Sequence, residues 1–330
     1  MTSNIKKDPL LIAFAVLNDD MGQGFINEGI KQGLQGGLIT PATGLIGSDI
    51  LNLLSIRHRK RDVAIFFEKE SILRPAVKSL VKKYNMNRPN HGIIFILEIN
   101  FSMNREYALE DNHWNSVSNT HQLLFMTYKH GRNKEILDSF KTLGYTGGTF
   151  FTSKGDFVNE RQKILGLNVS PQKDVMLSVV ETDRLPNIYS GFEDHFHVTN
   201  TKGMKLLSMD VNSFSESVNP KAVNNTSELS MLISIVSNDL EEEYSHIMKK
   251  FNMNGGTSIR GFGSISPEKI EKIFNINVTP QKNILFTVDK TEKINQAYLN
   301  ILENDKLMSE HVGVYFTLPL VEAYGLYNQD

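Results

Sequence analysis

The stretch that decides the fold is Lys163-Ile-Leu-Gly-Leu-Asn-Val-Ser-Pro-Gln-Lys173. It recurs as Lys272-Ile-Phe-Asn-Ile-Asn-Val-Thr-Pro-Gln-Lys282, 109 residues further along the chain. Seven of the eleven positions are identical. Similarity at a fixed spacing is the sequence signature of a repeated structural unit. Because the chain has 330 residues, this period leaves room for three copies.

Other landmarks keep the same spacing and extend the repeat to a first copy. Apolar strand-like runs lie at residues 11–16, 123–128 and 231–236. Each is followed by a glycine pair, at Gly36-Gly37, Gly147-Gly148 and Gly255-Gly256, with separations of 111 and 108 residues. A second set of apolar runs begins at Asp62, Asp174 and Asn283, with separations of 112 and 109 residues. The first copy matches the others in pattern more than in identity.

Each copy has the order strand, helix, strand, variable segment, strand, helix, strand. In the third copy we predict strands over residues 231–238, 257–262, 284–288 and 313–319. Helices are predicted over 240–252 and 293–307, and a short one from Ser266 to Phe274, which has an N-cap and then Pro267. The order is the βαββαβ motif of ferredoxin-like units, so we expect an α+β fold with three such units in tandem.

The domain boundaries follow from the repeat. We expect repeats over residues 1–103, 121–215 and 229–330. The stretches 104–120 and 216–228 are rich in Asn, Ser, Glu and Asp, and we interpret them as linkers.

The strand-like runs are apolar at nearly every position, which indicates burial on both faces of each sheet. Two helices cover only one face of a four-stranded sheet, so the other face needs a partner. Three units in one chain meet this need by packing their bare faces around a common axis. We therefore expect an intramolecular pseudo-trimer that acts as a monomer. Three separate beads would leave three apolar sheet faces in water.

Composition limits the functional classes. Apolar residues make up 40% of the chain and charged residues 22%, with a net charge of −2, which is typical of a globular protein and unlike one dominated by nucleic-acid phosphate contacts. The chain has no cysteine, so disulfides, thiolate metal sites and a cysteine nucleophile are excluded. The polar start lacks a signal-peptide core, and no apolar run approaches the ~20 residues of a membrane span. We expect a cytoplasmic protein without membrane insertion.

At this point a family resemblance becomes specific. Gly255-Gly-Thr-Ser-Ile-Arg-Gly-Phe-Gly263 resembles the second strand and loop entry of the PII and PII-like signal-transduction proteins, the nitrogen regulatory protein P-II group. His311-Val-Gly-Val-Tyr-Phe-Thr-Leu-Pro-Leu-Val321 resembles their last strand, and Tyr84-Asn-Met-Asn-Arg-Pro-Asn-His-Gly-Ile-Ile-Phe-Ile-Leu97 their final turn and strand. The resemblance is strongest in the third copy and extends over nearly the whole chain outside the linkers.

The resemblance implies a fused trimer of ferredoxin-like units with ligand clefts between neighbours. It implies a non-enzymatic regulatory protein that senses a small anionic metabolite and relays it to an unidentified partner protein by loop reordering. An adenine nucleotide is the candidate ligand, and no cofactor is required.

The resemblance also implies two walls for each cleft. The base of the loop after the second strand would supply Arg260, Gly261, Phe262, Gly263 and Ser264 in the third copy, Ser153, Lys154 and Gly155 in the second, and Thr43, Gly44 and Gly47 in the first. The turn before the last strand would supply Asn90, His91 and Gly92, Lys202 and Gly203, and His311 and Gly313. Glycines at the loop base would let the backbone approach a phosphate.

The chain also departs from the family. We find no Arg pair after the last strands, and the long loop with its modifiable Tyr is missing. A metal-tolerance protein of the CutA-like type, a weak nucleotide hydrolase and a structural interaction module with decayed clefts therefore remain alternatives.

Two rival motifs are weak. Gly22-Gln-Gly24 with Gly29 is too long for a dinucleotide-binding loop and favours an irregular helix start. His195-Phe-His197 falls in or at the end of a predicted helix, where solvated histidines are more common than metal ligands.

Overall fold

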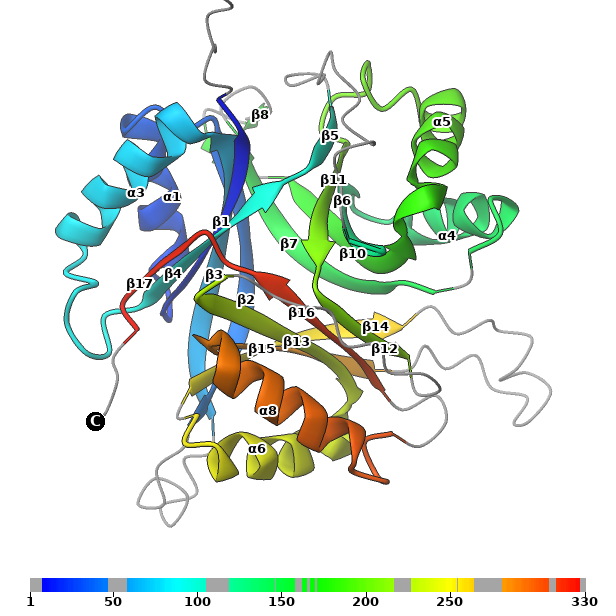
Figure 1. Cartoon of the computed structure of the whole chain (residues 1–330). Coiled ribbons are helices and arrows are strands. Elements are labelled where there is room, and N and C mark those ends of the chain that lie inside the picture. The colour runs from blue at the N-terminus through cyan, green and yellow to red at the C-terminus, as the bar shows by residue number, and fades with distance from the viewer. Residues whose placement is uncertain are drawn as a thin grey trace, which may run out of the picture.

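The structure of the chain is a computed structural model with an α+β fold (Figure 1). It describes residues 8–46, 58–104, 119–145, 147–157, 162–164, 167–169, 171–216, 227–253, 255–263, 281–308 and 313–326. We call residues 8–104 the first segment, 119–216 the second and 227–326 the third. No helix in these ranges is both long enough and apolar enough to cross a membrane.

The first segment forms an antiparallel sheet with two helices. Its elements are β1 (Leu10–Asn18), α1 (Gly22–Lys31), β2 (Gly36–Ile46), β3 (His58–Lys69), α3 (Glu70–Lys83) and β4 (Ile93–Ile99). The strand order across the sheet is β2-β3-β1-β4, with every pair antiparallel. The chain thus places its first and third strands in the middle, where apolar residues fill both faces.

The other two segments repeat this arrangement. The second contains β6 (His121–Lys129), α4 (Asn133–Thr142), β7 (Thr149–Phe157), β10 (Gln172–Glu181), a 3₁₀ turn at Thr182–Arg184, α5 (Leu185–Phe196) and β11 (Lys205–Val211), with a hairpin of β8 (Gln162–Ile164) and β9 (Leu167–Val169). The third contains β13 (Leu229–Ser237), a 3₁₀ turn at Asn238–Leu240, α6 (Glu241–Lys250), β14 (Gly255–Gly263), β15 (Gln281–Lys290), α8 (Thr291–Leu302) and β16 (Gly313–Pro319). Their strand orders are β7-β10-β6-β11 and β14-β15-β13-β16.

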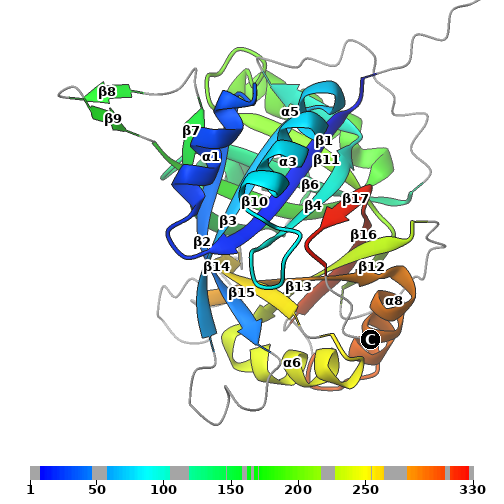
Figure 2. The ribbon, with the colours of Figure 1, turned by 90° about the vertical axis from the view of Figure 1, so that its left-hand side faces the viewer.

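A short strand at the end of each segment joins it to the next. The strand β5 (Phe101–Asn104) pairs with β11 of the second segment, and β12 (Ser213–Glu216) pairs with β16 of the third. The strand β17 (Glu322–Tyr324) returns to β4 of the first segment, which Figure 2 shows beside it. These three strands close the segments into a ring.

The second strands join the segments at a further place. The strand β2 pairs with β14 through Thr43 and Ser258, and with β7 through Ile39 and Lys154. The strands β7 and β14 pair through Thr149 and Gly263. Each second strand therefore contacts both of the others, and the three pairings follow one cyclic order.

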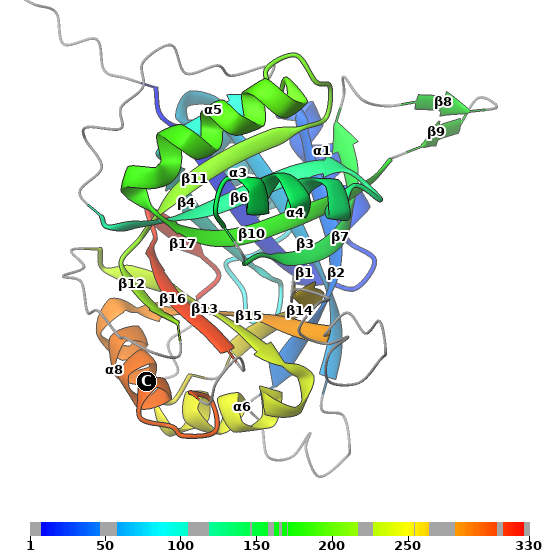
Figure 3. The same cartoon turned by 90° about the vertical axis from the view of Figure 1, so that its right-hand side faces the viewer.

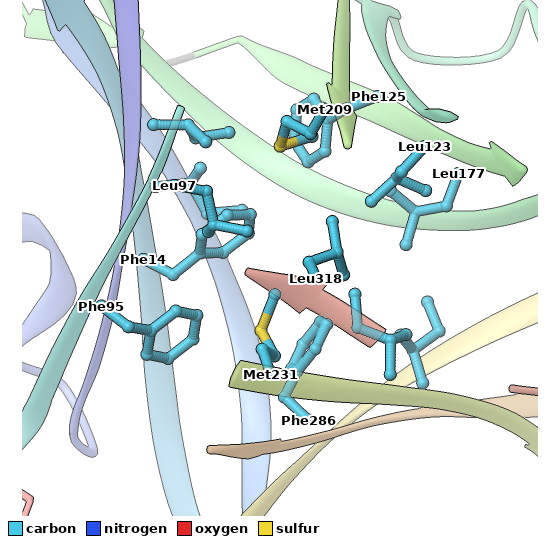
Figure 4. Packing of buried hydrophobic residues seen from close by; sticks show 14 of the residues in the cluster. Phe14, Phe95, Leu97, Leu123, Phe125, Leu177, Met209, Met231, Phe286 and Leu318 are labelled. Atoms are coloured by element: carbon cyan, nitrogen blue, oxygen red, sulfur yellow. The ribbon is translucent and has the colours of Figure 1, made fainter. Parts of the chain in front are cut away.

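The core is divided by the alternation of side chains along each strand. In β1, Leu10, Ile12, Phe14 and Val16 face a central cluster, whereas Leu11, Ala13, Ala15 and Leu17 face the helices. The central cluster takes side chains from all three segments, and Figure 4 shows Phe14, Phe125 and Phe286 in it. The helices cover the outer faces, as Figures 1 and 3 show. Burial on both faces explains why these strands are apolar at nearly every position.

Most of the third-copy elements lie where the sequence predicts them. The strand β16 spans the predicted 313–319, while β13, β14 and β15 lie over the other predicted strands. The prediction for the last helix was wrong at both ends, because α8 begins at Thr291 and ends at Leu302 instead of spanning 293–307. The short helix predicted from Ser266 to Phe274 lies outside the described residues. Asn104 and Glu216, assigned to linkers, are the last residues of β5 and β12.

Candidate functional site

The loop-base residues of the third copy lie at a seam between two segments. Phe262 and Gly263 pair with Phe150 and Thr149 of the second segment. A Cβ at Gly261 would lie 2.6 Å from the carbonyl oxygen of Phe150, so this glycine is required by the close approach of two strands. The Arg260 side chain is exposed, and Ser264 lies outside the described residues.

The loop-base residues of the other copies occupy corresponding seams. Thr43 and Gly44 pair with β14, whereas Lys154 and Gly155 pair with β2. Ser153 is buried, and its hydroxyl donates a hydrogen bond to the carbonyl oxygen of Lys173 at 3.4 Å. Gly47 lies outside the described residues. In these two copies the loop base therefore joins neighbouring segments, and its backbone takes part in sheet pairing.

The predicted turn residues have structural partners of their own. Asn90 and Gly92 have φ angles of 65° and 119°, and the Asn90 carbonyl accepts a hydrogen bond from the Asn18 side chain at 3.3 Å. His91 Nδ1 lies 3.2 Å from the carbonyl oxygen of Tyr84. In the second copy, Lys202 is exposed and Gly203 turns with a φ of 79°.

The third copy has a different reason for its glycine at this turn. A Cβ at Gly313 would lie 2.2 Å from the Tyr315 hydroxyl, so the ring of Tyr315 needs this space. That hydroxyl donates a hydrogen bond to the carbonyl oxygen of Leu307 at 2.9 Å. His311 lies outside the described residues.

Lys173, which was not predicted as a site residue, connects the two predicted walls of the second copy, at Ser153 and Gly203. Lys173 is only 4% exposed, accepts the Ser153 hydrogen bond on its backbone and donates from Nζ to the Gly203 carbonyl oxygen at 2.9 Å. The position of Lys173 is occupied by Arg61 on β3 and by Lys282 on β15. Lys173 faces Lys129 across its strand pair, and in the same register Arg61 faces Asn18 and Lys282 faces Ser237. Burial lowers the pKa of Lys282, an effect that nearby Asp239 opposes.

The next residue along these strands holds the start of the first helix. Asp62 accepts a hydrogen bond from the Gly22 backbone N–H at 2.8 Å, and Asp174 accepts one from Gly131 at 3.0 Å. Burial raises the pKa of Asp62, although the Gly22 hydrogen bond opposes the shift. Gly22 is required here, since a Cβ would lie 2.7 Å from Ile39. The first glycine of the Gly-x-Gly pattern therefore has a packing role.

An open pocket of about 330 Å³ lies between the second and third segments. We call it the Arg184 cleft. Its lining comes from the second segment (His121, Leu123, Gly144, Tyr145, Gly147, Gly148, Thr149, Leu177, Ser178, Val179, Val180, Glu181, Arg184 and Phe214) and from the third (Ile235, Val314 and Phe316). Several of these residues also belong to the central cluster, so the floor of the cleft is the edge of the core.

Polar and aromatic groups surround this apolar floor. Arg184 Nε lies 2.8 Å from Glu181 Oε2, and its guanidinium group lies 5.7 Å from the centre of the Tyr145 ring. Burial raises the pKa of Tyr145, and Arg184 opposes that shift. The His121 and Phe214 rings lie 4.9 Å apart. The cleft thus combines an apolar interior with one cation and one carboxylate.

Two of the predicted third-copy residues adjoin this cleft without lining it. Gly263 pairs with Thr149, and Gly313 immediately precedes Val314. None of the lining residues was predicted from the sequence as a ligand contact, although Gly147-Gly148 marks the repeat. Only the strand register reveals that residues from both segments meet here.

The described residues contain no group of three or more His, Asp or Glu side chains that could hold a metal ion. His195 lies in the last turn of α5 against the Phe196 ring, with 4.5 Å between ring centres. His197 follows as the C-cap, with a left-handed φ of 48°. Both positions agree with a predicted helix end.

Comparison with known proteins identifies no family. No family model matches the chain, and no curated protein matches it. Among solved structures, an aspartate kinase from Synechocystis is 10% identical with a TM-score of 0.25, covering 94% of this chain and 52% of its own. A proposed monooxygenase from Fusobacterium nucleatum is 12% identical with a TM-score of 0.20, covering 63% of this chain and 95% of its own. The chain spans about half the length of the aspartate kinase, and neither likeness carries an argument about function.

Proposed function

We propose that the chain is a PII-like regulatory protein built as three ferredoxin-like units in one pseudo-trimer. It binds a small metabolite with an anionic group between two units and relays the binding to a partner protein. It acts by binding and not by turnover. An adenine nucleotide is the first ligand to test, because the resemblance in sequence favours it.

The observation that carries the proposal is the Arg184 cleft at a junction of the ring. The three segments share one strand order, and a terminal strand of each pairs with the next. The cleft of about 330 Å³ lies between the second and third segments, and pockets of roughly 300–1,000 Å³ commonly hold small ligands. Arg184 at its rim offers the positive charge that an anionic group needs.

The position of the cleft also suits a relay. Thr149 lines it and pairs with Gly263, which immediately precedes residues 264–280. A ligand that contacts Thr149 therefore acts on the strand leading into that stretch. Such a ligand shifts a conformational equilibrium only to the extent that it binds the two conformations with different affinity.

Calorimetric titration tests the proposal with a panel of adenine nucleotides, sugar phosphates, carboxylic acids and amino acids. We expect at least one saturable interaction and ligand-dependent protease cleavage within residues 264–280. A variant with Val179→Phe and Val314→Lys, which fills the cleft, should lose the binding. Absence of binding to every panel member, or binding unchanged in this variant, would contradict the proposal and favour a structural interaction module.

A further inference from the structure

The three segments can be compared position by position, because they share one register. His121 faces Glu181 across its strand pair, just as Leu10 faces Lys69 and Leu229 faces Lys290. The correspondence continues through the turns and closing strands next to these pairs. Arg184 then corresponds to Ile72 in the first segment and Lys293 in the third, and Tyr145 corresponds to Leu34 and Met253. Phe214 corresponds to Ser102 and Ala323. Polar and aromatic side chains that differ from the other two segments therefore gather in the Arg184 cleft.

At the junction between the first and second segments, larger side chains occupy the corresponding positions. Phe67 on β3 corresponds to Val179 on β10, because Phe67 faces Ile12 and Val179 faces Leu123 at the same place in the register. Lys205 corresponds to Val314, since they face Thr127 and Ile235. The Lys205 Nζ lies 4.5 Å from the centre of the Phe67 ring, and Lys205 is only 3% exposed. At the junction between the second and third segments, the smaller Val179 and Val314 leave this space open as the Arg184 cleft.

The charges of the cleft narrow the class of ligand. Arg184 and Glu181 are 52% and 54% exposed, so their ion pair is weak and both side chains can take new partners. A phosphate chain carries several negative charges, and here it would meet one guanidinium group beside a carboxylate. A zwitterion suits the pair better. Its carboxylate accepts two hydrogen bonds from the guanidinium group of Arg184, and its ammonium group donates to Glu181.

The floor of the cleft selects what the zwitterion carries. Leu123, Leu177 and Phe316 are buried members of the central cluster, and the Tyr145 and Phe214 rings stand beside them. An apolar side chain gains free energy by leaving water for such a surface. We infer that the Arg184 cleft binds one free α-amino acid with an apolar or aromatic side chain. This inference rests on the proposed function and names its ligand class.

Calorimetry of the full chain with phenylalanine, leucine and tryptophan tests the inference. Hydrocinnamate, which lacks the amine, and phenethylamine, which lacks the carboxylate, are the matched compounds. We expect one site per chain for at least one amino acid, and at least about tenfold weaker binding when either group is missing. Arg184→Ala and Glu181→Gln should each weaken binding similarly, because they remove one of the two charge contacts.

Lys293→Ala is the matched control variant, because Lys293 occupies the position of Arg184 in the third segment and is paired with Asp289. It should leave binding unchanged. Binding of a nucleotide without binding of any amino acid overturns the inference and leaves the proposed function standing. Absence of binding to every compound overturns both. Equal binding of phenylalanine and hydrocinnamate also overturns the inference, because Glu181 would then have no role.

Discussion

Gly22 and Gly24 lie two residues apart in α1 but have different surroundings. A Cβ at Gly22 would lie 2.7 Å from Ile39 and 3.0 Å from Asp62, whereas one at Gly24 would lie 3.7 Å from the Tyr84 hydroxyl. We expect Gly22→Ala to destabilise the fold by about 1–3 kcal/mol through overpacking. Gly24→Ala should instead be neutral or stabilising by up to about 1 kcal/mol, because alanine favours a helix. Urea unfolding of both variants checks this, and equal effects would contradict it.

Asp62 predicts a pH dependence with a definite sign. Burial raises its pKa in the folded state above the unfolded value near 3.8, so the folded state binds the proton more tightly. The stability that this proton affinity provides is present below the unfolded pKa and is lost as the pH rises through the folded pKa. Asp62→Asn keeps an acceptor for the Gly22 N–H and removes the charge. The third segment has an uncharged residue, Asn283, at the corresponding position.

We therefore expect Asp62→Asn to raise the free energy of unfolding at pH 7 relative to the wild type, with a smaller gain or none at pH 3. Denaturant unfolding at both pH values measures the difference. A variant that is less stable than the wild type at pH 7 would show that the charge of Asp62, and not only its acceptor oxygen, supports the helix start.

At the scale of elements, the strand β17 holds the third segment to the first. Val321 donates its backbone N–H to the Ile96 carbonyl oxygen at 2.8 Å, and Glu322 forms an ion pair with Arg74. We expect removal of residues 321–330 to destabilise the protein by about 1–3 kcal/mol, because β4 loses a paired strand. Glu322→Gln should cost less than about 1 kcal/mol, since this ion pair is partly exposed. Thermal unfolding distinguishes strand pairing from the ion pair, and a truncated chain of wild-type stability would contradict the prediction.

Strands were more predictable from the sequence than helix ends. Apolar runs identify β1, β6 and β13 because burial on both faces leaves no alternative pattern. The helix predicted over 293–307 ends early because the Asn304 side chain accepts the N–H groups of Lys306 and Leu307 and forms a turn. It begins early because the Thr291 N–H donates a hydrogen bond to the carbonyl oxygen of Glu228, the residue before β13. Such bonds depend on tertiary contacts that helical periodicity does not contain.

Over the whole molecule, Phe14 connects the three segments. Its ring centre lies 5.4 Å from Phe95, 6.2 Å from Phe125 and 6.3 Å from Phe286. We expect Phe14→Ala to destabilise the fold by about 3–5 kcal/mol and to reduce amide hydrogen-exchange protection in β6 and β13 as well as in β1.

The matched variant for Phe14 is Phe25→Ala. Phe25 is also buried, but it lies in the cluster between the sheet and the helices of the first segment. Its removal should lower protection mainly within that segment. Identical protection patterns for the two variants, measured by mass spectrometry, would contradict the connecting role of Phe14.

The candidate site was the least predictable feature. The family resemblance implied clefts between units, but none of the described residues that it selected lines the Arg184 cleft. The lining of the Arg184 cleft comes from strands and turns of two segments, so its members become neighbours only through register. Gly261 was predicted to approach a phosphate and Gly313 to contact a ligand in the opposite wall, yet both glycines accommodate a close approach within the protein. In the sequence, a glycine that makes room for another part of the protein looks the same as one that makes room for a ligand.

The ring closed by β5, β12 and β17 has a consequence for dilution. Three separate chains would dissociate as their concentration falls, because association follows mass action. Here each partner is tethered, and short tethers hold linked partners at effective concentrations on the order of millimolar. The junctions between segments should therefore remain assembled at any working concentration of the protein.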